Sequence, residues 1–234
     1  MSKRVAILQS SYIPWKGYFD LINMVDEFIL YDDRQYTKRD WRNRNRVKTP
    51  QGPIWLTIPV KVKGQYTQRI DEVVVSDPSW PENHWQTLHH NYASAPHFAA
   101  GRAIFERLYL ECAPTMSNLS QINRTFIEAI CGILGINTRI SISTDYPAPA
   151  SDRTGTLIGL CKSAGATGYL SGPSARAYIK EEEFERAAIA LSYMDYSGYP
   201  EYPQLNPPFV HEVTVLDLIF NTGPDARLFM KSFG

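Results

Sequence analysis

The first 33 residues alternate between strand-like and helix-like patterns, and this alternation constrains the fold more than any other feature of the chain. The apolar run RVAILQS predicts a buried strand, and GYFDLINMVDEF repeats apolar residues at helical spacing. FILYDD then predicts a second strand that ends in two carboxylates. A strand, a helix and a strand this close together form a βαβ unit, which implies a parallel sheet.

Similar patterns continue along the rest of the chain. IWLTIPVKV, IDEVVVS, TRISIS, ATGYLSG and AIALSYMDY predict strands. Helices are predicted at SWPENHWQTLHHNY, FAAGRAIFERLYLE, NLSQINRTFIEAICGILG, TLIGLCKSAG, KEEEFERA and TVLDLIFNTG. Ser79 with Glu82 predicts a capping box, Thr214 and Asp217 are expected to cap the last helix, and Gly135 is an expected helix stop.

These elements predict an α/β fold. We expect an open parallel sheet, Rossmann-like or nucleotidyltransferase-like, flanked by helices within a single domain over residues 1–234. The helices of about 79–135 predict a helical insertion or subdomain. DYPAPASD, rich in Pro and Ala, is the best candidate for a linker.

Composition excludes several classes of protein. The 24 basic and 24 acidic residues balance, which argues against a general nucleic-acid or membrane binder. No apolar run approaches the roughly 18 residues of a membrane-spanning helix, and no signal peptide is expected. Three cysteines without a CxxC pair disfavour a zinc site. We therefore expect a cytoplasmic protein without a bound metal.

The loop SSYIPWKGY follows the first predicted strand. In open parallel sheets, ligands collect at the carboxyl ends of strands, beside helix N-termini. The expected lining residues are Gln9, Tyr12, Trp15 and Tyr18. The alternative is that these aromatics only cover the end of the sheet, because no GxGxxG or Walker pattern is present.

A basic segment borders the same expected crevice. From Arg34 to Lys48 there are seven basic residues against one acid, Asp40. Arginine suits phosphate or carboxylate, so we expect anion binding here, the alternative being a solvated face. The expected ligand contacts are Gln35, Tyr36, Lys38, Trp41, Arg42, Asn43, Arg44 and Lys48.

Asp32 and Asp33 end the second predicted strand and are the first candidates for catalysis. They could bind a hydroxyl, a magnesium ion or an amine, or could simply pair with the neighbouring arginines. His90 is the other candidate base, because an unperturbed histidine titrates near pH 6.5. It belongs to a cluster whose spacing does not suit zinc: His84, His89, His90 and His97. We favour Asp33 over His90.

The segment YLSGPSARAY puts small polar groups and an arginine at the end of another predicted strand. Ser171, Gly172, Arg176 and Tyr178 are its expected ligand contacts, and the alternative is an ordinary turn. No Ser-His-Asp or Cys-His pattern is readable, so we favour direct attack over a covalent enzyme intermediate.

Taken together, these segments resemble the WbqC-like protein family. The resemblance rests on QSSYIPWKGYFDLI, FILYDDRQYTKRDWRNRNRVK, LTIPV, ATGYLSGPSARAYI, and YPQLNPPF followed by TVLDLIFNTG, which run from about Gln9 to Gly223. Two departures are the Ser10–Ser11 pair, where a Gln-Pro start is expected, and Arg34, where a small apolar residue is usual.

The resemblance implies a bacterial cytoplasmic protein of cell-surface polysaccharide (O-antigen) biosynthesis. A transferase that adds an acyl or aminoacyl group to a nucleotide-linked amino sugar suits that setting, and Gln204 of YPQLNPPF then joins the expected substrate contacts. The implied partners are a nucleotide sugar or another phosphate-bearing small molecule, with an acyl carrier (pantetheine), an acyl carrier protein or a nucleotide donor as the source of the group.

Two alternatives stay open. The opening loop loosely resembles that of cytidylyltransferases and pantothenate synthetases, which would make the chain a nucleotidyltransferase-like enzyme. Those proteins carry HxGH where this chain has WKGY, which argues against adenylylation by their mechanism. The other alternative is a nucleotide or nucleic-acid binding module that uses the Arg-rich segment, and the neutral net charge disfavours nucleic acid.

Overall fold

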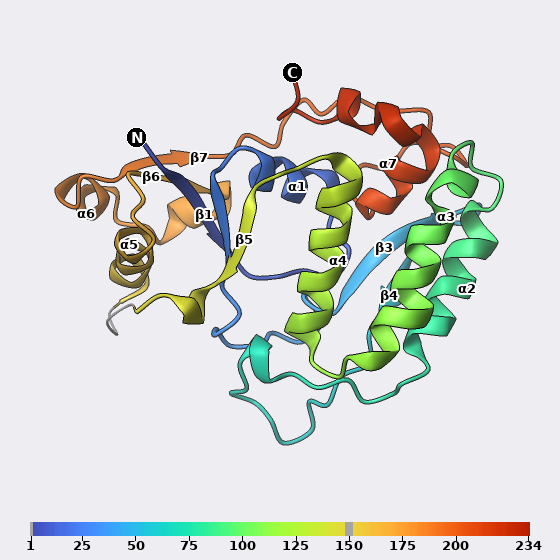
Figure 1. The fold of residues 1–234 in the computed structure, drawn as a ribbon, viewed down its shortest axis with the longest axis horizontal. Helices are drawn as coiled ribbons and strands as arrows, with labels where there is room; N and C mark the ends of the chain where they lie inside the picture. Colours follow the sequence, from blue (N-terminus) through green and yellow to red (C-terminus); the bar gives the residue numbers. More distant parts are fainter. Residues whose placement is uncertain (1, 148–151) are drawn as a thin grey trace.

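The computed structural model describes residues 2–147 and 152–234 (Figure 1). The predicted linker DYPAPASD falls in part outside these described residues. The first half of the chain forms β1 (Arg4–Leu8), α1 (Lys16–Asn23), β2 (Glu27–Leu30), β3 (Arg44–Thr49), β4 (Gly52–Thr57), α2 (Trp80–Tyr92), α3 (Phe98–Arg107) and α4 (Leu119–Leu134). The second half forms β5 (Arg139–Ile142), α5 (Arg153–Ser163), β6 (Gly168–Ser171), α6 (Glu181–Arg186), β7 (Ala190–Tyr193) and α7 (Val215–Thr222).

Short helical turns connect several of these elements. The 3-10 turns are η1 (Ile70–Glu72), η3 (Ala113–Thr115), η4 (Ser143–Asp145), η5 (Pro173–Ala177) and η6 (Gly223–Phe229), and a π-helical turn, η2 (Leu108–Cys112), extends α3.

The main sheet has five parallel strands in the order β5-β2-β1-β6-β7, which confirms the predicted open α/β fold. Along the chain, β2 and then β5 are added on one side of β1, and β6 and then β7 are added on the other side. The order therefore reverses between β1 and β6. In open α/β sheets, ligands bind outside the carboxyl ends of the strands at such a switch point.

Helices cover both faces of this sheet. Successive side chains of each strand point to opposite faces, so each face packs its own set of side chains against its helices. Val5, Ile7 and Ile29 pack in one buried cluster with residues of α5 and α6. Phe28 and Leu30 pack in a second cluster with residues of α1 and α4. Figure 1 shows α5 and α6 on one side of the sheet and α1 and α4 on the other.

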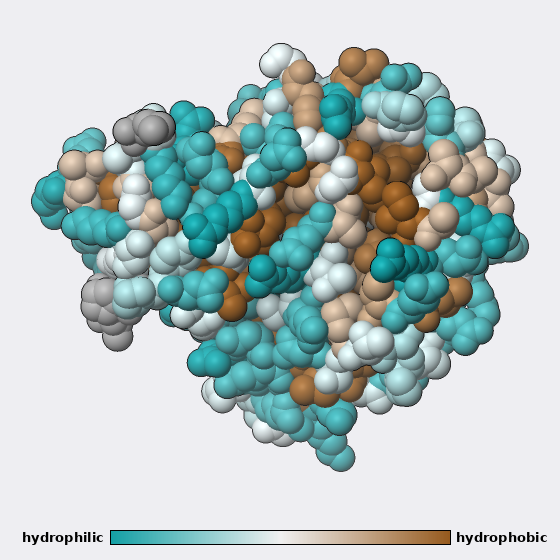
Figure 2. Space-filling view, in the orientation of Figure 1, coloured by the Kyte–Doolittle hydropathy of each residue, from teal (hydrophilic) through white to brown (hydrophobic). Residues whose placement is uncertain are grey.

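The second cluster continues from α1 and α4 into the rest of the molecule. It includes residues of α2, α3, α7 and the β3–β4 hairpin, so the region 79–135 shares its core with the sheet. Figure 2 shows hydrophobic side chains gathered beside α4, towards α3 and the C-terminal elements. Ile104 and Leu228 are among the exposed large hydrophobic residues of the chain.

The prediction of a strand over residues 70–76 is wrong. Ile70–Glu72 forms a 3-10 turn, in which Val73 N donates to Ile70 O at 3.1 Å. Val74 then bridges Asn118 and Val75 bridges Val60. Because these bridges go to two different segments, no continuous strand ladder forms.

Two capping predictions are also wrong, whereas the predicted stop is confirmed. The Ser79 side chain does not cap α2, because its hydroxyl donates to Asp77 Oδ1 at 2.7 Å. Thr214 caps α7 as predicted, but the Asp217 carboxylate instead accepts from Tyr92 and Tyr202 at 2.8 and 2.6 Å. Gly135 ends α4 with φ 66°, a left-handed conformation that glycine adopts without strain.

Candidate active site at the carboxyl edge of the sheet

A cavity of about 280 Å³ lies at the carboxyl ends of β2 and β5. Asp32 and Asp33 follow β2, Ser143 and Thr144 follow β5, and the N-terminal turns of α4 close the opposite side. The full lining is Leu30, Asp32, Asp33, Asp71, Asn118, Ser120, Gln121, Arg124, Ile142, Ser143 and Thr144.

Asp32 is the buried carboxylate of this cavity and joins three elements. Its Oδ1 accepts from Ser10 N, just after β1, at 2.8 Å, and its Oδ2 accepts from the Ser120 hydroxyl of α4. Burial raises the pKa of Asp32, and the hydrogen bonds from Ser120 and Ser10 oppose that rise. Asp32 therefore fixes the ends of β1 and β2 against α4.

Asp33 is the more accessible of the two carboxylates, with a side chain that is 23% exposed. Its Oδ1 accepts from the Ser143 hydroxyl at 2.6 Å, and its Oδ2 pairs with Arg34 Nη2 at 2.9 Å. Since a carboxylate has lone pairs for about four hydrogen bonds, Asp33 retains acceptor capacity towards a ligand in the cavity.

The oxygen atoms around the cavity favour ligands that donate hydrogen bonds, and two of its three carboxylates are paired with arginines, Asp33 with Arg34 and Asp71 with Arg69, at 2.9 Å each. Asp32, Asp33 and Asp71 contribute three carboxyl groups to its lining. Arg124 is its one lining guanidinium among the described residues, and its Nε already donates to Glu128 at 2.7 Å. The cavity can therefore accept hydrogen bonds from an ammonium group or from sugar hydroxyls.

Arg42 holds the loop that follows β1. Its Nη1 donates to Gln9 O and Ser10 O at 2.9 Å each and to Ser11 Oγ at 3.1 Å. Asn123 Nδ2 of α4 donates to Ser10 Oγ at 3.0 Å and to Arg42 O at 2.8 Å. The predicted anion contact Arg42 thus shapes the switch-point loop through its own hydrogen bonds.

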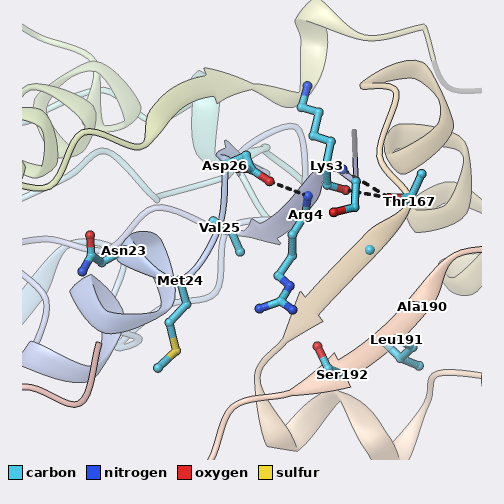
Figure 3. A pocket seen from close by; sticks show the side chains of 12 residues that line it. Lys3, Arg4, Asn23, Met24, Val25, Asp26, Thr167, Ala190, Leu191 and Ser192 are labelled. Carbon is cyan, nitrogen blue, oxygen red and sulfur yellow. Dashed lines mark hydrogen bonds between the residues drawn. The ribbon is translucent and has the colours of Figure 1, made fainter. Parts of the chain in front are cut away.

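A larger cavity, of about 530 Å³, lies at the amino ends of β1, β6 and β7 (Figure 3). Lys3, Arg4, Asp26, Thr167 and Ser192 are among its lining residues, and Arg4 N donates to Asp26 Oδ2 at 2.7 Å. Because ligands of open α/β sheets bind at carboxyl ends, the smaller cavity at the opposite edge is the better candidate for an active site.

The model of the WbqC-like protein family matches residues 9–228, which include both edge carboxylates. The chain belongs to the WbqC-like protein family. This WbqC-like chain is also 50% identical, over 229 residues, to the "Uncharacterized protein Rv1507c" of Mycobacterium tuberculosis (strain ATCC 25618 / H37Rv), with 98% of each chain covered. No solved structure matches it. Within the described residues, it has no helix long and apolar enough to cross a membrane.

The opening aromatics of the WbqC-like chain are packing residues. Tyr12 is fully buried and its hydroxyl contacts His84 Nδ1 at 2.9 Å and Tyr109 Oη at 2.6 Å, so it cannot line a ligand pocket as predicted. Tyr18 is buried and donates to Gln9 O at 3.1 Å, so the same correction applies to it. A glycine is needed at position 17, because a Cβ there would lie 2.4 Å from the Trp15 ring.

Trp15 and Gln9 complete that predicted set. The Trp15 ring packs against Tyr196 and Tyr199, with ring centroids 5.2 and 5.4 Å apart, and does not line the carboxyl-edge cavity. Gln9 directly follows β1 and is partly exposed at the switch point, where a ligand contact by Gln9 stays a prediction.

The Arg-rich segment is divided between several environments, because its second half forms the unpredicted strand β3, which pairs with β4 at the start of the predicted strand IWLTIPVKV. Lys48 is buried and donates to Pro208 O, and Asn43 is buried between Tyr36 Oη and Ile58 O. These three side chains, Tyr36, Asn43 and Lys48, bind within the protein rather than facing the cavity. Gln35 and Lys38 are exposed beside Tyr66, whereas Trp41 is exposed and Arg44 partly buried beside Trp55. The ligand contacts of these four residues stay predictions.

The remaining predicted residues are placed at very different sites. Ser171, Gly172, Arg176 and Tyr178 lie at and just after the carboxyl end of β6, on the same edge as Asp33. His90 is exposed on α2, away from the cavity lining. The Gln204 amide donates to Asp217 Oδ1 and accepts from Val210 N, both at 2.8 Å, and thereby folds its own loop.

Sequence reasoning missed the residues that α4 and β5 contribute to the cavity. Ser143 is the last residue of the predicted strand TRISIS, so applying the carboxyl-end rule to that strand would have found it. Ser120, Gln121 and Arg124 lie in the first turns of α4. Their position depends on how α4 packs against the sheet, and no local pattern in the sequence predicts that packing.

Proposed function

We propose that this WbqC-like chain is a transferase that adds an acyl or aminoacyl group to the amine of a nucleotide-linked amino sugar in the assembly of surface polysaccharide. The observation that carries the proposal is the partly exposed Asp33 carboxylate, held by Ser143 in a cavity with an excess of carboxyl groups. An amino sugar offers the ammonium and hydroxyl groups that such a cavity accepts.

The proposed reaction is direct attack of the amine on a thioester. The sugar amine forms the new C–N bond with the acyl carbonyl, and the C–S bond to a pantetheine thiol breaks. The bound ammonium first loses one proton to solvent, Asp33 takes the second proton as the free amine attacks, and the thiolate leaves and is protonated by solvent. Backbone N–H groups of the Ser171–Gly172 turn are assigned to the developing oxyanion.

In this proposal Asp32 is a positioning residue rather than a second base. Both of its oxygens already accept hydrogen bonds, from Ser10 N and from Ser120. It holds the loop after β1 and the N-terminal end of α4 around the cavity, so that Asp33 and Ser143 keep their relative geometry.

The alternatives draw less support from the geometry. A nucleic-acid module would need a continuous basic face, whereas Arg42 binds backbone carbonyls and Lys48 is buried. A nucleotidyltransferase-like enzyme would release pyrophosphate from a nucleoside triphosphate, and this provides a direct comparison.

The test incubates the protein with nucleotide-linked amino sugars and a panel of acyl and aminoacyl thioesters of coenzyme A or of an acyl carrier protein. Mass spectrometry follows the N-acylated sugar, and a thiol reagent follows the released thiol. Equimolar formation of both supports the proposal. Pyrophosphate release from a nucleoside triphosphate without any N-acylated product contradicts it and favours the nucleotidyltransferase-like alternative.

A further inference from the structure

Three arginine–tyrosine pairs lie at the carboxyl edge, outside the carboxylate cavity. The Arg34 guanidinium carbon lies 4.4 Å from the Tyr31 ring centroid, and that of Arg176 lies 4.3 Å from the Tyr193 centroid. The third pair, Arg153 and Tyr178, is looser, at 5.6 Å. Guanidinium groups stack on aromatic faces in this way and keep their N–H edges free for anions.

The sheet brings these pairs to one edge. Tyr31 directly follows β2, and Tyr193 ends β7, where it pairs with Ser171 of β6. Arg176 lies in η5, and Tyr178 directly follows η5. Arg153 begins α5, which packs in one buried cluster with Tyr169 of β6 and Phe184 of α6.

Tyr178 connects the pairs into one cluster. Burial raises the pKa of Tyr31; Arg34 opposes this rise, and Asp33 and Tyr178 add to it. Burial and a hydrogen bond to Glu181 raise the pKa of Tyr193 to about 12, and Arg176 and Tyr178 also act on it. Tyr178 lies two residues after Arg176, its N–H donates to Ala175 O at 3.1 Å, and its side chain, beside Arg153, is 46% exposed.

Two of the three guanidinium groups have no carboxylate partner. Arg34 pairs with Asp33, but within residues 2–147 and 152–234 neither Arg153 nor Arg176 forms an ion pair. The edge thus changes from carboxylate-rich at the cavity to guanidinium-rich at this cluster. The Asp33–Arg34 pair lies at the boundary between the two regions.

We infer that the cluster of Tyr31, Arg34, Arg153, Arg176, Tyr178 and Tyr193 is a subsite for the nucleoside diphosphate part of the ligand. Arg153 and Arg176 bind the diphosphate oxygens, the exposed Tyr178 ring stacks on the base, and Arg34, paired with Asp33, lies towards the sugar end of the ligand. This inference rests on the proposed function, because it places the diphosphate beside the cavity assigned to the amino sugar.

The dimensions agree with an extended ligand. The strands β2 and β7 are three positions apart in the sheet, and neighbouring strands lie about 4.8 Å apart, so their ends are separated by roughly 14 Å. A ligand that contacts both Arg34 and Arg176 must therefore extend along the edge, as a nucleoside diphosphate linked to a sugar does.

The test measures binding of uridine diphosphate, thymidine diphosphate, uridine, thymidine and inorganic pyrophosphate to the full chain by calorimetry. Arg153→Gln and Arg176→Gln are each expected to weaken diphosphate binding at least about tenfold, because each removes a charge-assisted contact. Tyr178→Ala is expected to weaken binding of the nucleoside diphosphates but not of pyrophosphate, and Tyr178→Phe is expected to retain both.

Arg107→Gln is the matched control, because Arg107 is an exposed arginine on α3 that pairs with Glu111. Its affinities should equal those of the unmodified chain, and thermal melts of all variants should coincide. Undiminished diphosphate binding in both Arg153→Gln and Arg176→Gln would overturn the inference. So would nucleosides that bind as tightly as their diphosphates, or diphosphates that do not bind at millimolar concentration.

This outcome is separable from that of the proposed function. If the diphosphates bind through these arginines but no acyl transfer is found, the subsite stands and the proposed reaction fails. If transfer occurs and the arginine variants bind normally, the reaction stands and the subsite fails.

Discussion

The Ser143 hydroxyl donates to Asp33 Oδ1 at 2.6 Å, and this bond joins the carboxyl ends of β5 and β2, which are 110 residues apart in sequence. The proposed base is therefore oriented by a residue that follows β5, the third strand of the main sheet in sequence order. Arg34 holds the other oxygen of the same carboxylate at 2.9 Å.

Replacing Ser143 should affect turnover more than stability. Ser143→Ala removes one hydrogen bond, which is expected to lower the free energy of unfolding by about 1 kcal/mol. The same change frees the Asp33 carboxylate to rotate, so kcat for acyl transfer should fall about tenfold, whereas Ser143→Thr should retain most of it. Steady-state kinetics and urea denaturation of both variants check this, and unchanged kcat in Ser143→Ala would remove Ser143 from the site.

The buried Asp32 should make the protein less stable as the pH rises above about 4. Burial raises its pKa in the folded protein, so the unfolded chain loses this proton first, at its ordinary pKa of about 3.9. Stability is then lost between that pH and the raised folded pKa. Asp32→Asn should remove this component, so urea denaturation from pH 4 to 7 should show a smaller loss in the variant. An identical pH dependence in both proteins would argue against the raised pKa.

Lys16 should act on stability in the opposite direction at high pH. It is buried, its Nζ donates to Pro200 O at 2.8 Å, and it lies over the Tyr199 and Tyr202 rings at 5.0 and 5.1 Å. Burial lowers its pKa to about 8, with Asp20 opposing.

Between pH 8 and about 10.4 the unfolded chain holds the Lys16 proton that the folded protein has released, so this lysine adds stability as the pH rises. The contribution is at most about 1.4 kcal/mol per pH unit. Lys16→Met should show a smaller rise, or a steeper fall, than the unmodified chain in urea denaturation from pH 7.5 to 10. Parallel curves would show that Lys16 keeps an ordinary pKa.

Replacing Arg42 should destabilise the protein more than replacing Arg44, although both lie in the same basic segment. Arg42→Ala leaves the acceptors of Gln9, Ser10 and Ser11 without their donor, so it should lower the free energy of unfolding by about 2 kcal/mol. Arg44→Ala removes a stacking contact with Trp55 and a hydrogen bond to Arg39 O near the surface, and should cost about 1 kcal/mol. Urea denaturation of the two variants compares them directly, and equal losses would contradict the assignment of Arg42 to the switch-point loop.

The sheet was predictable from the sequence because its strands are short apolar runs, separated by segments in which apolar residues recur at helical spacing. The βαβ unit of the first 33 residues and the two carboxylates that end FILYDD were enough to place Asp33 at a carboxyl edge. The helix stop at Gly135 followed from local chemistry in the same way.

Long-range contacts explain what could not be predicted. Tyr12 looks like a ligand contact in SSYIPWKGY, but its environment is set by His84 and Tyr109, from α2 and η2. Likewise, the strand β3 within the basic run from Arg34 to Lys48 was not predicted. Its residues Arg44, Asn45, Arg46, Val47 and Lys48 do not show the alternation of apolar and polar residues that indicates a strand. Asn45, for instance, is a polar residue of β3 that is buried, and its amide donates to Ile13 O at 2.9 Å.

The most direct test of the central claim compares Asp33→Asn with the unmodified chain in the acyl-transfer assay. An amide cannot take the proton of the attacking amine, so kcat should fall about 100-fold or more, with the fold retained. Asp225→Asn is the matched control, because Asp225 is exposed in η6 and does not line the cavity. Full activity in Asp225→Asn together with the loss in Asp33→Asn is the predicted result, and full activity in Asp33→Asn would contradict the account.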